Sequence, residues 1–256
     1  LFGRAFYLCS SAEKMSSPFR LRVRGHAGHA SVPGIADNAL VKAAPLIERL
    51  AAYRPELRLG PETSAMIQAV VGQELEPEEA LRLARETDEA AAELLEPLLA
   101  FTLSPTMISA SERRNVIPHL CEVEVDCRLL PGQTQDEVEP VLREVLGDGD
   151  YSLEWIEARG GTRSELGTPL WDAVESFVAS IEPEATLLPV CVAGFTDSHW
   201  LREAFGTVAY GFFPSKAMDP QLASRLIHSA NERIVLDDLE LAVDCFRHAA
   251  VQVTGG

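Results

Sequence analysis

Residues 25–33 of the chain read GHAGHASVP, and this stretch decides how its neighbours are interpreted. Two histidines lie three positions apart between glycines, and a proline closes the stretch. The residues before it, FRLRVR at 19–24, alternate between apolar and charged, and residues 38–52 after it have helical spacing. The pattern predicts a strand, a glycine-loosened turn and a helix. Because imidazole titrates nearest neutral pH, His29 in this turn is a candidate for a chemical role, and an ordinary polar turn is the alternative.

The overall composition predicts a folded chain with a packed core. Of its 256 residues 46% are hydrophobic, which is enough for one or two domains. The net charge of -17 argues against nucleic acid or an anionic membrane surface as a partner. No apolar run approaches the length of a membrane span. The motifs HExxH and GxSxG and a glycine-rich phosphate loop are absent from the sequence, so the chemistries that they carry find no support.

Cysteine usage and the start of the chain give two further expectations. The five cysteines, at positions 9, 121, 127, 191 and 245, are scattered and form no CxxC pair. This is typical of reduced, buried thiols and predicts a cytoplasmic protein. The chain starts at Leu1 with an apolar segment, residues 1–11, that has the character of a strand in the middle of a domain. We therefore expect further sequence upstream of Leu1.

The order of elements in residues 18–158 predicts a ferredoxin-like α+β domain, in which two helices cover a four-stranded antiparallel sheet. The first and third strands of that topology are neighbours, so the arginines at 20, 22 and 24 are expected beside the acidic residues at 122, 124 and 126. A helical insert is expected at about 76–101, and a further strand at 64–71. The predicted strands of the domain are 19–24, 105–111, 119–129 and 151–157, and its predicted helices are 38–52 and 136–146.

Residues 159–256 change to alternating helices and strands, which is typical of a mostly parallel α/β sheet. A polar linker at 159–167 separates them from the ferredoxin-like domain. We therefore predict a second domain, of the α/β class, made of residues 1–17 and 159–256. Its predicted strands are 186–192 and 207–212, and its predicted helices are 168–180, 197–203 and 236–251.

Three further positions are candidates for a site, and each has a plainer alternative. Asn115, in the run NVIP, is a candidate site residue, and its plainer alternative is an ordinary turn residue. Arg128 either closes the charge row with Asp126 or takes a substrate carboxylate through its two-pronged guanidinium group. Gly194 starts the run GFTDS. That run is either a helix N-cap or a pocket wall at the carboxyl end of a strand, where open α/β sheets bind ligands.

The last candidate is His228, which lies four residues before Glu232. The two side chains can share a helix face and a metal ion, and a surface hydrogen bond between them is the alternative. The histidines at 119, 199 and 248 are predicted to be structural, and the histidine at 26 is predicted to be exposed.

The five candidates, in this order, resemble the di-zinc exopeptidase and deacylase family, metallopeptidase family twenty. That family includes glutamate carboxypeptidase, acetylornithine deacetylase, succinyl-diaminopimelate desuccinylase and aminoacylase. The resemblance spans nearly the whole chain and implies a zinc-binding α/β domain with an inserted ferredoxin-like lid that makes a homodimer. The matching segments are AEK at 12–14, residues 25–33, NVIP at 115–118 followed by DCR at 126–128, GFTD at 194–197 and HSANE at 228–232.

The resemblance also implies roles for the candidates. His29 matches a lid histidine that donates a hydrogen bond to the developing oxyanion in a neighbouring active site, often that of the partner subunit. Asn115 and Arg128 match lid residues that bind the substrate. The resemblance implies that Arg128 binds the substrate carboxylate. Gly194 matches a residue that lines the substrate pocket, and His228 matches the last zinc ligand.

The chain departs from the family where the metal chemistry should lie. The family uses a His-x-Asp, a bridging Asp and a Glu-Glu pair that carries the general base, and His-x-Asp is absent from this sequence. Glu78 and Glu79 lie in the helical insert, where they are typical of the first turn of a helix. A catalytic zinc ion takes three protein ligands. We therefore expect a complete lid, an incomplete catalytic domain and a chain that is inactive by itself, with its zinc centre absent or incomplete.

The function implied by the resemblance is that of a metal-dependent amidohydrolase, either an exopeptidase or an N-acyl-amino-acid deacylase. In the intact enzyme a metal-bound hydroxide would attack the amide carbonyl of a peptide or small molecule with a free carboxylate. Ligand type leaves zinc, cobalt and manganese open. The alternatives are a non-catalytic dimerisation or scaffold module and, by fold analogy, a domain that senses small molecules.

Overall fold

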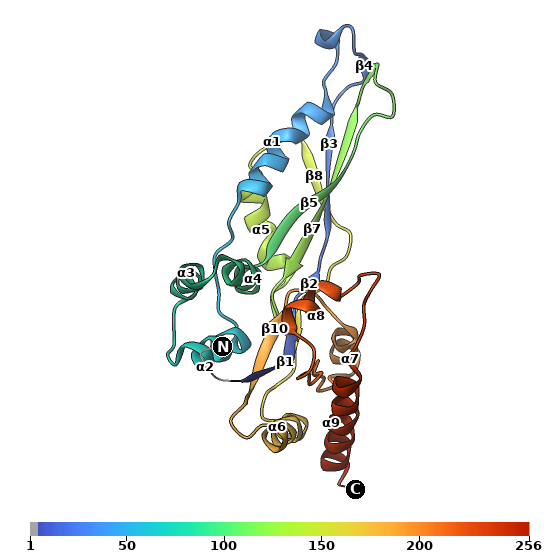
Figure 1. Cartoon of the computed structure of the whole chain (residues 1–256). Coiled ribbons are helices and arrows are strands. Elements are labelled where there is room, and N and C mark those ends of the chain that lie inside the picture. The colour runs from blue at the N-terminus through green and yellow to red at the C-terminus, as the bar shows by residue number, and fades with distance from the viewer. Residues whose placement is uncertain (1–4, 256) are drawn as a thin grey trace.

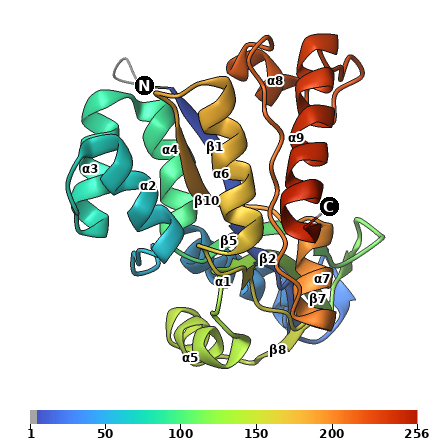
Figure 2. The ribbon, with the colours of Figure 1, turned by 90° about the horizontal axis from the view of Figure 1, so that it is seen from below.

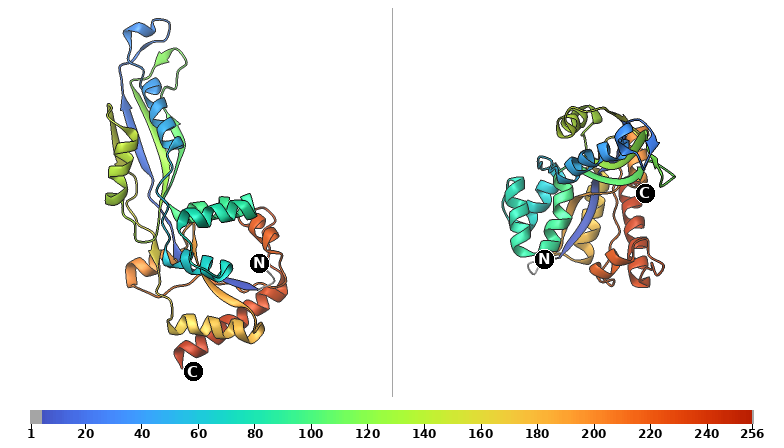
Figure 3. Two further views of the ribbon diagram at one scale, coloured as in Figure 1. Left: turned by 90° about the vertical axis from the view of Figure 1, so that its left-hand side faces the viewer. Right: turned by 90° about the horizontal axis from the view of Figure 1, so that it is seen from above.

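The computed structural model describes residues 5–255 and shows an elongated molecule with two main parts (Figure 1). Residues 15–52 and 101–156 form a long antiparallel sheet with two helices, which we call the lid. Residues 5–14 and 159–255 form a smaller sheet with helices, which we call the α/β layer. Three helices at 61–99, the helical insert, lie at the base of the lid, beside the α/β layer (Figure 3).

The lid sheet has the ferredoxin-like strand order that the sequence predicts. Its strands run β8-β3-β7-β5 across the sheet and every neighbouring pair is antiparallel, with short β2 also paired to β7. Strand β5 starts three residues earlier than predicted. The strands are β2 (Met15–Ser16), β3 (Phe19–Arg24), β5 (Thr102–Ser109), β7 (Leu120–Leu129) and β8 (Tyr151–Trp155).

The core of the lid lies between one face of this sheet and two helices, α1 (Ala39–Ala52) and α5 (Gln135–Leu146). Alternate residues of β3 and β7 point to that face, because successive side chains of a strand point to opposite sides. The Asn38 side chain caps α1 by accepting from the Leu40 and Val41 amides. The buried residues of the two strands are Phe19, Leu21, Val23, Cys121, Val123, Val125, Cys127 and Leu129.

The opposite face of the lid sheet carries the charged rows, and the predicted pairing of the first and third strands is confirmed. Arg20 lies opposite Glu124 and Arg22 opposite Glu122 in the β3–β7 register. The shortest nitrogen-to-oxygen distances are 2.6 Å and 2.7 Å, respectively. Arg24 lies opposite Leu120 instead, because β7 begins there. Two ion pairs rather than three therefore fix this register.

The tip of the lid is built by the stretch at 25–33. Strand β4 (Gly28–His29) pairs with β6 (Val116–Ile117), and a 3-10 turn, η1 (Pro33–Ile35), follows. The backbone then returns to its start, and the His26 and Asp37 peptides exchange hydrogen bonds of 2.8 and 3.1 Å. A Cβ atom at Gly25 would lie 2.1 Å from the Asp37 carbonyl oxygen. Glycine is therefore required where the two segments close on each other.

The helical insert corrects two expectations. Residues 64–71, predicted as a strand, belong to helix α2 (Pro61–Val71), which starts with proline and ends at Gly72 in the left-handed conformation. The single helical segment predicted near 76–101 is broken at extended Asp88 into α3 (Pro77–Thr87) and α4 (Glu89–Leu99). Fully buried Lys14, the last residue of the segment 5–14 of the α/β layer, ties the end of the insert to that layer. Its ammonium group donates to the Pro97 and Ala100 carbonyls, both at 2.8 Å, and burial lowers its pKa to about 8.

The α/β layer has a three-stranded sheet in the order β10-β1-β9. Its central strand is parallel to β10 and antiparallel to β9. Helices α6 and α9 pack against each other, and β1, β10 and α6 share a buried apolar cluster (Figure 2). The strands are β1 (Phe6–Glu13), β9 (Thr162–Arg163) and β10 (Thr186–Val192), and the helices are α6 (Pro169–Ile181), α7 (Asp197–Phe205), α8 (Pro220–Leu226) and α9 (Leu236–Thr254).

Three details of this layer differ from the sequence prediction. The strand predicted at 207–212 is wrong, because in this segment a single antiparallel bridge, between Gly211 and Ser10, is formed. Helix α8 was not predicted, although Asp219 caps it. The predicted strand at 1–11 lies partly outside the described residues; within them the strand, β1, starts at Phe6 and continues to Glu13.

All five cysteines are buried free thiols, as expected. Burial raises the pKa of Cys9 and of Cys127 to about 12, which keeps these thiols protonated. In the described part of the chain, every helix is too short or too polar to cross a bilayer.

Candidate functional site

Two of the predicted site residues come together at the tip of the lid. His29 and Asn115 are both exposed, and they lie on the two segments that the β4–β6 pair joins. The Ala30 amide donates to the Asn115 carbonyl oxygen at 3.0 Å, which holds these two segments side by side. The tip therefore presents an imidazole and a carboxamide at the end of the molecule farthest from the α/β layer (Figure 1).

The imidazole of His29 is oriented by its own turn. The Ser31 backbone amide donates to Nδ1 at 3.2 Å, and the Ser31 hydroxyl oxygen lies 2.7 Å from the same nitrogen. A ring nitrogen that accepts an N–H carries no proton, so the neutral ring is protonated at Nε2. His29 thus offers an N–H donor to a group outside the chain.

Two other predicted residues meet at the base of the lid. Arg128, near the end of β7, donates from Nε to Asp126 at 2.9 Å and from Nη1 to the Ala193 carbonyl oxygen at 3.2 Å. A Cβ atom at Gly194 would lie 3.8 Å from the same Nη1. The arginine therefore joins the lid to the turn after β10. Its side chain keeps 38% of its surface exposed, which leaves room for a second anion.

The turn at 194–197 is held by a buried carboxylate whose contacts the sequence did not reveal. Fully buried Glu13, at the end of β1, accepts from the Thr196 amide at 3.1 Å and from the Thr196 hydroxyl group. Arg202 approaches Glu13 at 3.7 Å and donates to Ser164 at 2.9 Å. Burial lowers the pKa of Arg202, although Glu13 opposes this shift. The same Thr196 hydroxyl caps α7, so the predicted N-cap is also present.

His228 lies apart from both groups. It is exposed, its φ of 60° is left-handed, and its amide donates to Glu232 at 3.2 Å. The loop joins α9, where Asp238 accepts from the Lys216 amide, and Lys216 pairs with Glu182 at 3.1 Å. Glu182 in turn accepts from Tyr7 at the start of β1. The loop therefore lies toward the amino end of β1, whereas Arg128 and Gly194 lie at the carboxyl end.

The tip and the base of the lid are far apart in one chain. Strand β7 runs from Leu120, next to the tip, to Arg128 at the base. At about 3.4 Å per residue this stretch alone is about 27 Å long. One small substrate cannot touch His29 and Arg128 of the same chain in this conformation.

A metal centre does not fit the described residues of this chain. Among them no group of three or more His, Cys, Asp or Glu side chains is arranged to hold an ion. Since a catalytic zinc ion takes three protein ligands, His228 cannot form such a centre with its present neighbours.

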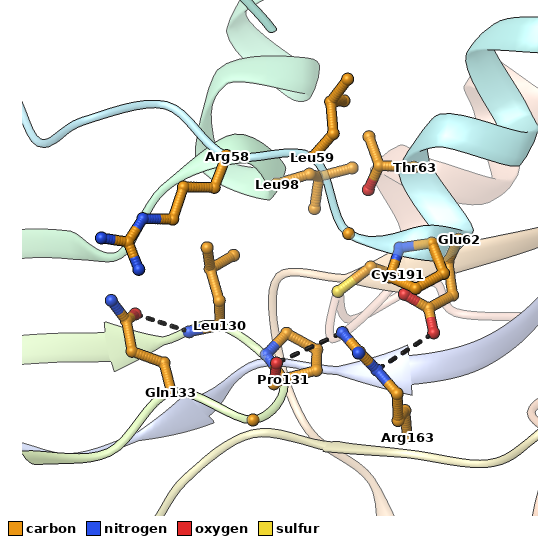
Figure 4. Close-up of a pocket in the computed structure, with 13 residues that line it drawn as sticks. Arg58, Leu59, Glu62, Thr63, Leu98, Leu130, Pro131, Gln133, Arg163 and Cys191 are labelled. Carbon is orange, nitrogen blue, oxygen red and sulfur yellow. Dashed lines mark hydrogen bonds and ion pairs between the residues drawn. The ribbon is translucent and has the colours of Figure 1, made fainter. Parts of the chain in front are cut away.

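A cavity of about 220 Å³ lies elsewhere, between the start of α2, the end of β7 and β9 (Figure 4). Buried Glu62 pairs there with Arg163 at 3.3 Å, and Arg163 also donates to the Pro131 carbonyl at 3.2 Å. Cys191 lines the cavity, and burial raises the pKa of its thiol to about 11. The residues described as its lining include none of the five predicted site residues, and its charged groups are already paired.

Comparison of the sequence with known proteins identifies the family to which this chain is related. Residues 11–153, more than half of the chain, match the model of the peptidase dimerisation domain of the M20 peptidases. The N-fatty-acyl-amino acid synthase/hydrolase PM20D1 of Homo sapiens is 28% identical over 157 residues, which are 59% of this chain and 30% of that protein. PM20D1 of Bos taurus is 29% identical over 154 residues, 57% of this chain and 29% of that protein. The chain thus spans less than a third of the length of these curated relatives.

Solved structures share the fold across nearly the whole chain. The M20 family metallo-carboxypeptidase Sso-CP2 from Sulfolobus solfataricus has a TM-score of 0.65 at 15% identity, over 98% of this chain and 62% of that chain. The dipeptidase Dug1p from Saccharomyces cerevisiae has a TM-score of 0.63 at 13% identity, over 98% of this chain and 56% of that chain. The chain therefore belongs to the family of M20 peptidase dimerisation domains, with a lid and an α/β layer that share the M20 peptidase fold.

Proposed function

We propose that this chain supplies the lid and part of the catalytic layer of a metal-dependent amidohydrolase that cleaves N-acyl amino acids or peptides with a free carboxylate. The observation that carries the proposal is the partly exposed side chain of Arg128 beside Gly194, at the carboxyl end of the α/β sheet. Open α/β sheets bind ligands at this edge, and a guanidinium group recognises a carboxylate through two parallel hydrogen bonds. The names of the curated relatives, which act on N-fatty-acyl amino acids, agree with such a substrate.

In this proposal His29 acts on a substrate held by another copy of the chain. Its Nε2–H points away from the turn that fixes Nδ1, and it lies a whole strand length from Arg128 of its own chain. Donated to the oxyanion of a tetrahedral intermediate, this hydrogen bond strengthens as charge develops on the oxygen. Asn115, on the segment beside it, is proposed to hold the substrate at the same position.

A homodimer through the lid is part of the same proposal. Among the described strands β5 pairs with β7 alone, which leaves its other edge open. Met107 and Ile108 on this edge strand are 64% and 55% exposed. An exposed apolar edge strand is a ready surface for pairing with a second chain.

The metal ligands are proposed to come mainly from residues outside this chain. We keep His228 as a ligand candidate that reaches such a site only if its loop moves to the carboxyl end of β1. Zinc is the proposed metal, and a cytoplasmic location stays a prediction.

Isothermal titration of this chain with zinc tests whether the metal ligands lie mainly outside it. We expect no tight uptake, because His228 has no partner ligands arranged around it. Tight binding of two equivalents by the chain would show that it holds a complete di-zinc centre, and that the ligands do not come from elsewhere.

The second candidate is a non-catalytic dimerisation module, which the open edge of β5 and the missing metal cluster in the described residues both favour. The natural reading frame separates the two functions. A His-x-Asp and a Glu-Glu upstream of Leu1 support the enzyme, whereas a start codon next to Leu1 supports the module.

A further inference from the structure

The tip of the lid is rich in basic residues, although the chain as a whole is strongly acidic. Its two segments, residues 24–37 and 110–119, hold three arginines and three histidines against two carboxylates, whereas the whole chain has a net charge of -17. Consecutive Arg113 and Arg114 are both exposed in the loop at 110–115, which we call the arginine loop. Neither side chain forms an ion pair with a described residue. The arginine loop therefore offers positive charge to a group outside the chain.

The helical insert at the base of the lid carries the opposite charge. Residues 61–99 hold ten carboxylates and two arginines. Both arginines are already paired within the insert, and Arg85 meets Glu96 at 3.0 Å. Glu93 on α4 is exposed and forms no ion pair with a described residue. A surface with this excess of one charge attracts a patch of the opposite sign.

A groove of about 710 Å³ lies between the insert and the first residues of β5, and we call it the insert groove. Glu93 lines it from α4, and residues 102–104 line it from β5. Its other charged lining residues are engaged within the chain, because Arg85 pairs with Glu96 and Arg54 donates to two backbone carbonyls. Glu93 is thus the carboxylate in the described lining that is open to a partner. The groove also adjoins β5, whose second edge is unpaired among the described strands.

Antiparallel pairing of two β5 strands would bring an arginine loop to an insert groove. Strand β5 runs from Thr102, next to the insert, to Ser109, next to the arginine loop (Figure 1). In an antiparallel pair with twofold symmetry, the start of each strand lies beside the end of the other. The residues that follow Ser109 then lie near the end of α4 of the second copy. At about 3.3 Å per residue, Arg113 can reach about 13 Å beyond the end of its strand.

We propose that in the homodimer the arginine loop of each copy docks in the insert groove of the other, with Arg113 and Arg114 facing Glu93. The inference rests on the proposed function, because it uses the dimer through β5, and it assigns the helical insert a role as the surface that holds the partner's tip. Twofold symmetry makes the contact twice. The contact also positions His29 in the second copy, because β4 and β6 join its turn to the arginine loop.

Charge reversal on the two surfaces tests this proposal with the chain itself. Arg113→Glu/Arg114→Glu reverses the loop and Glu93→Arg reverses the groove, and all three positions are exposed. Sedimentation equilibrium gives the dissociation constant of the dimer. At low salt we expect it to rise about 100-fold in the loop variant and about 10-fold in the groove variant. Both differences should shrink at about 0.5 M salt, where exposed charges are screened.

The loop variant and the groove variant should bind each other better than either binds itself. In the mixed dimer a reversed loop meets a reversed groove and a native loop meets a native groove, whereas each variant alone brings like charges together twice. We expect the mixture to dimerise about 10-fold or more tightly than the loop variant alone. Glu74→Arg is the matched control, because it makes the same charge change at an exposed insert residue that is not among the described lining of the groove. It should leave the dissociation constant unchanged.

The proposal is overturned if the loop variant dimerises as tightly as the wild type, if mixing brings no gain, or if Glu74→Arg causes the same loss as Glu93→Arg. A chain that stays monomeric overturns it as well. If Met107→Lys dissociates the dimer and the charge reversals do not, the dimer through β5 stands and the docking of the arginine loop falls. If the mixed dimer forms but the complete protein hydrolyses no N-acyl amino acid, the docking stands and the amidohydrolase assignment falls.

Discussion

Arg22 lies opposite Glu122 across β3 and β7, and its Nε donates to the carboxylate at 2.7 Å. Its Nη1 donates to Glu154 of β8 on the other side, so a single guanidinium group links three strands of the lid. The carboxylates and the guanidinium group support each other, which lowers the pKa of Glu122 and raises that of Arg22. The charged rows thus specify which strands are neighbours, while the opposite face of the sheet supplies the apolar core.

Reversing this central charge should destabilise the lid. In Arg22→Glu the new carboxylate faces Glu122 and Glu154, so the midpoint of thermal unfolding should fall, and added salt should narrow the difference from the wild type. Arg24→Glu is the matched control, because Arg24 lies opposite Leu120. The double variant Arg22→Glu/Glu122→Arg should recover part of the loss. An Arg22→Glu variant that unfolds at a higher temperature would mean that the pairing is not what holds this register.

The start of α9 should lose stability at low pH, because the carboxylate of Asp238 holds the segment before it. Burial alone would raise the pKa of Asp238, but hydrogen bonds from Ser215 and the amides of residues 216–218 outweigh it and hold the pKa near 2. Because this pKa lies below the unfolded value near 3.8, the carboxylate stabilises the fold above about pH 4, and its contribution disappears as the pH falls toward 2.

Asp238→Asn should therefore cost about 2 kcal/mol at pH 7, and the difference from wild type should shrink as the pH is lowered from 4 to 2. Urea unfolding at a series of pH values measures both effects. A difference that stays constant down to pH 2 would mean that the charge of Asp238 contributes nothing.

The exposed edge of β5 should carry the proposed homodimer. Met107→Lys places a charge where a second chain would pair, while Glu124 opposite Met107 can accept the new ammonium group within one chain. Light scattering after size exclusion should show a dimer for the wild type and a monomer for the variant. Leu94→Lys changes a 75% exposed apolar side chain on α4 and should leave the dimer intact. A variant Met107→Lys that remains dimeric would place the interface elsewhere.

The lid could be predicted from sequence because its signals are local and repeated. FRLRVR at 19–24 and the alternation through 120–129 give both the inward face and the charged face, and the charges on that face indicate which strands pair. The strand pattern made Arg128 and Gly194 separate candidates, and only the family resemblance assigned both to the substrate; their contact is a finding of the structure. Their plainer alternatives are also present, because Arg128 pairs with Asp126 and Thr196 caps α7.

The features that the sequence did not reveal depend on contacts between distant segments. Residues 64–71 have enough β-branched and apolar character for a strand, but Pro61 and Gly72 delimit a helix that packs on β10. The apolar run at 207–212 has strand composition, yet a single bridge to Ser10 is formed there. Glu13 has no local signal of its role either, because its partners Thr196 and Arg202 lie far along the chain.

The central claim is that His29, at the tip of the lid, donates a hydrogen bond to the reacting amide in another copy of the chain. Its most direct test is the hydrolysis of N-acyl amino acids by the protein expressed from its complete reading frame with zinc, as wild type and as His29→Ala. The account predicts that kcat falls about 100- to 1,000-fold while the dimer stays intact. It also predicts that mixing His29→Ala with an inactive Arg128→Ala variant restores part of the activity, because mixed dimers then contain one complete site. Unchanged kcat in His29→Ala, or no recovery in exchanged mixed dimers, would contradict the claim.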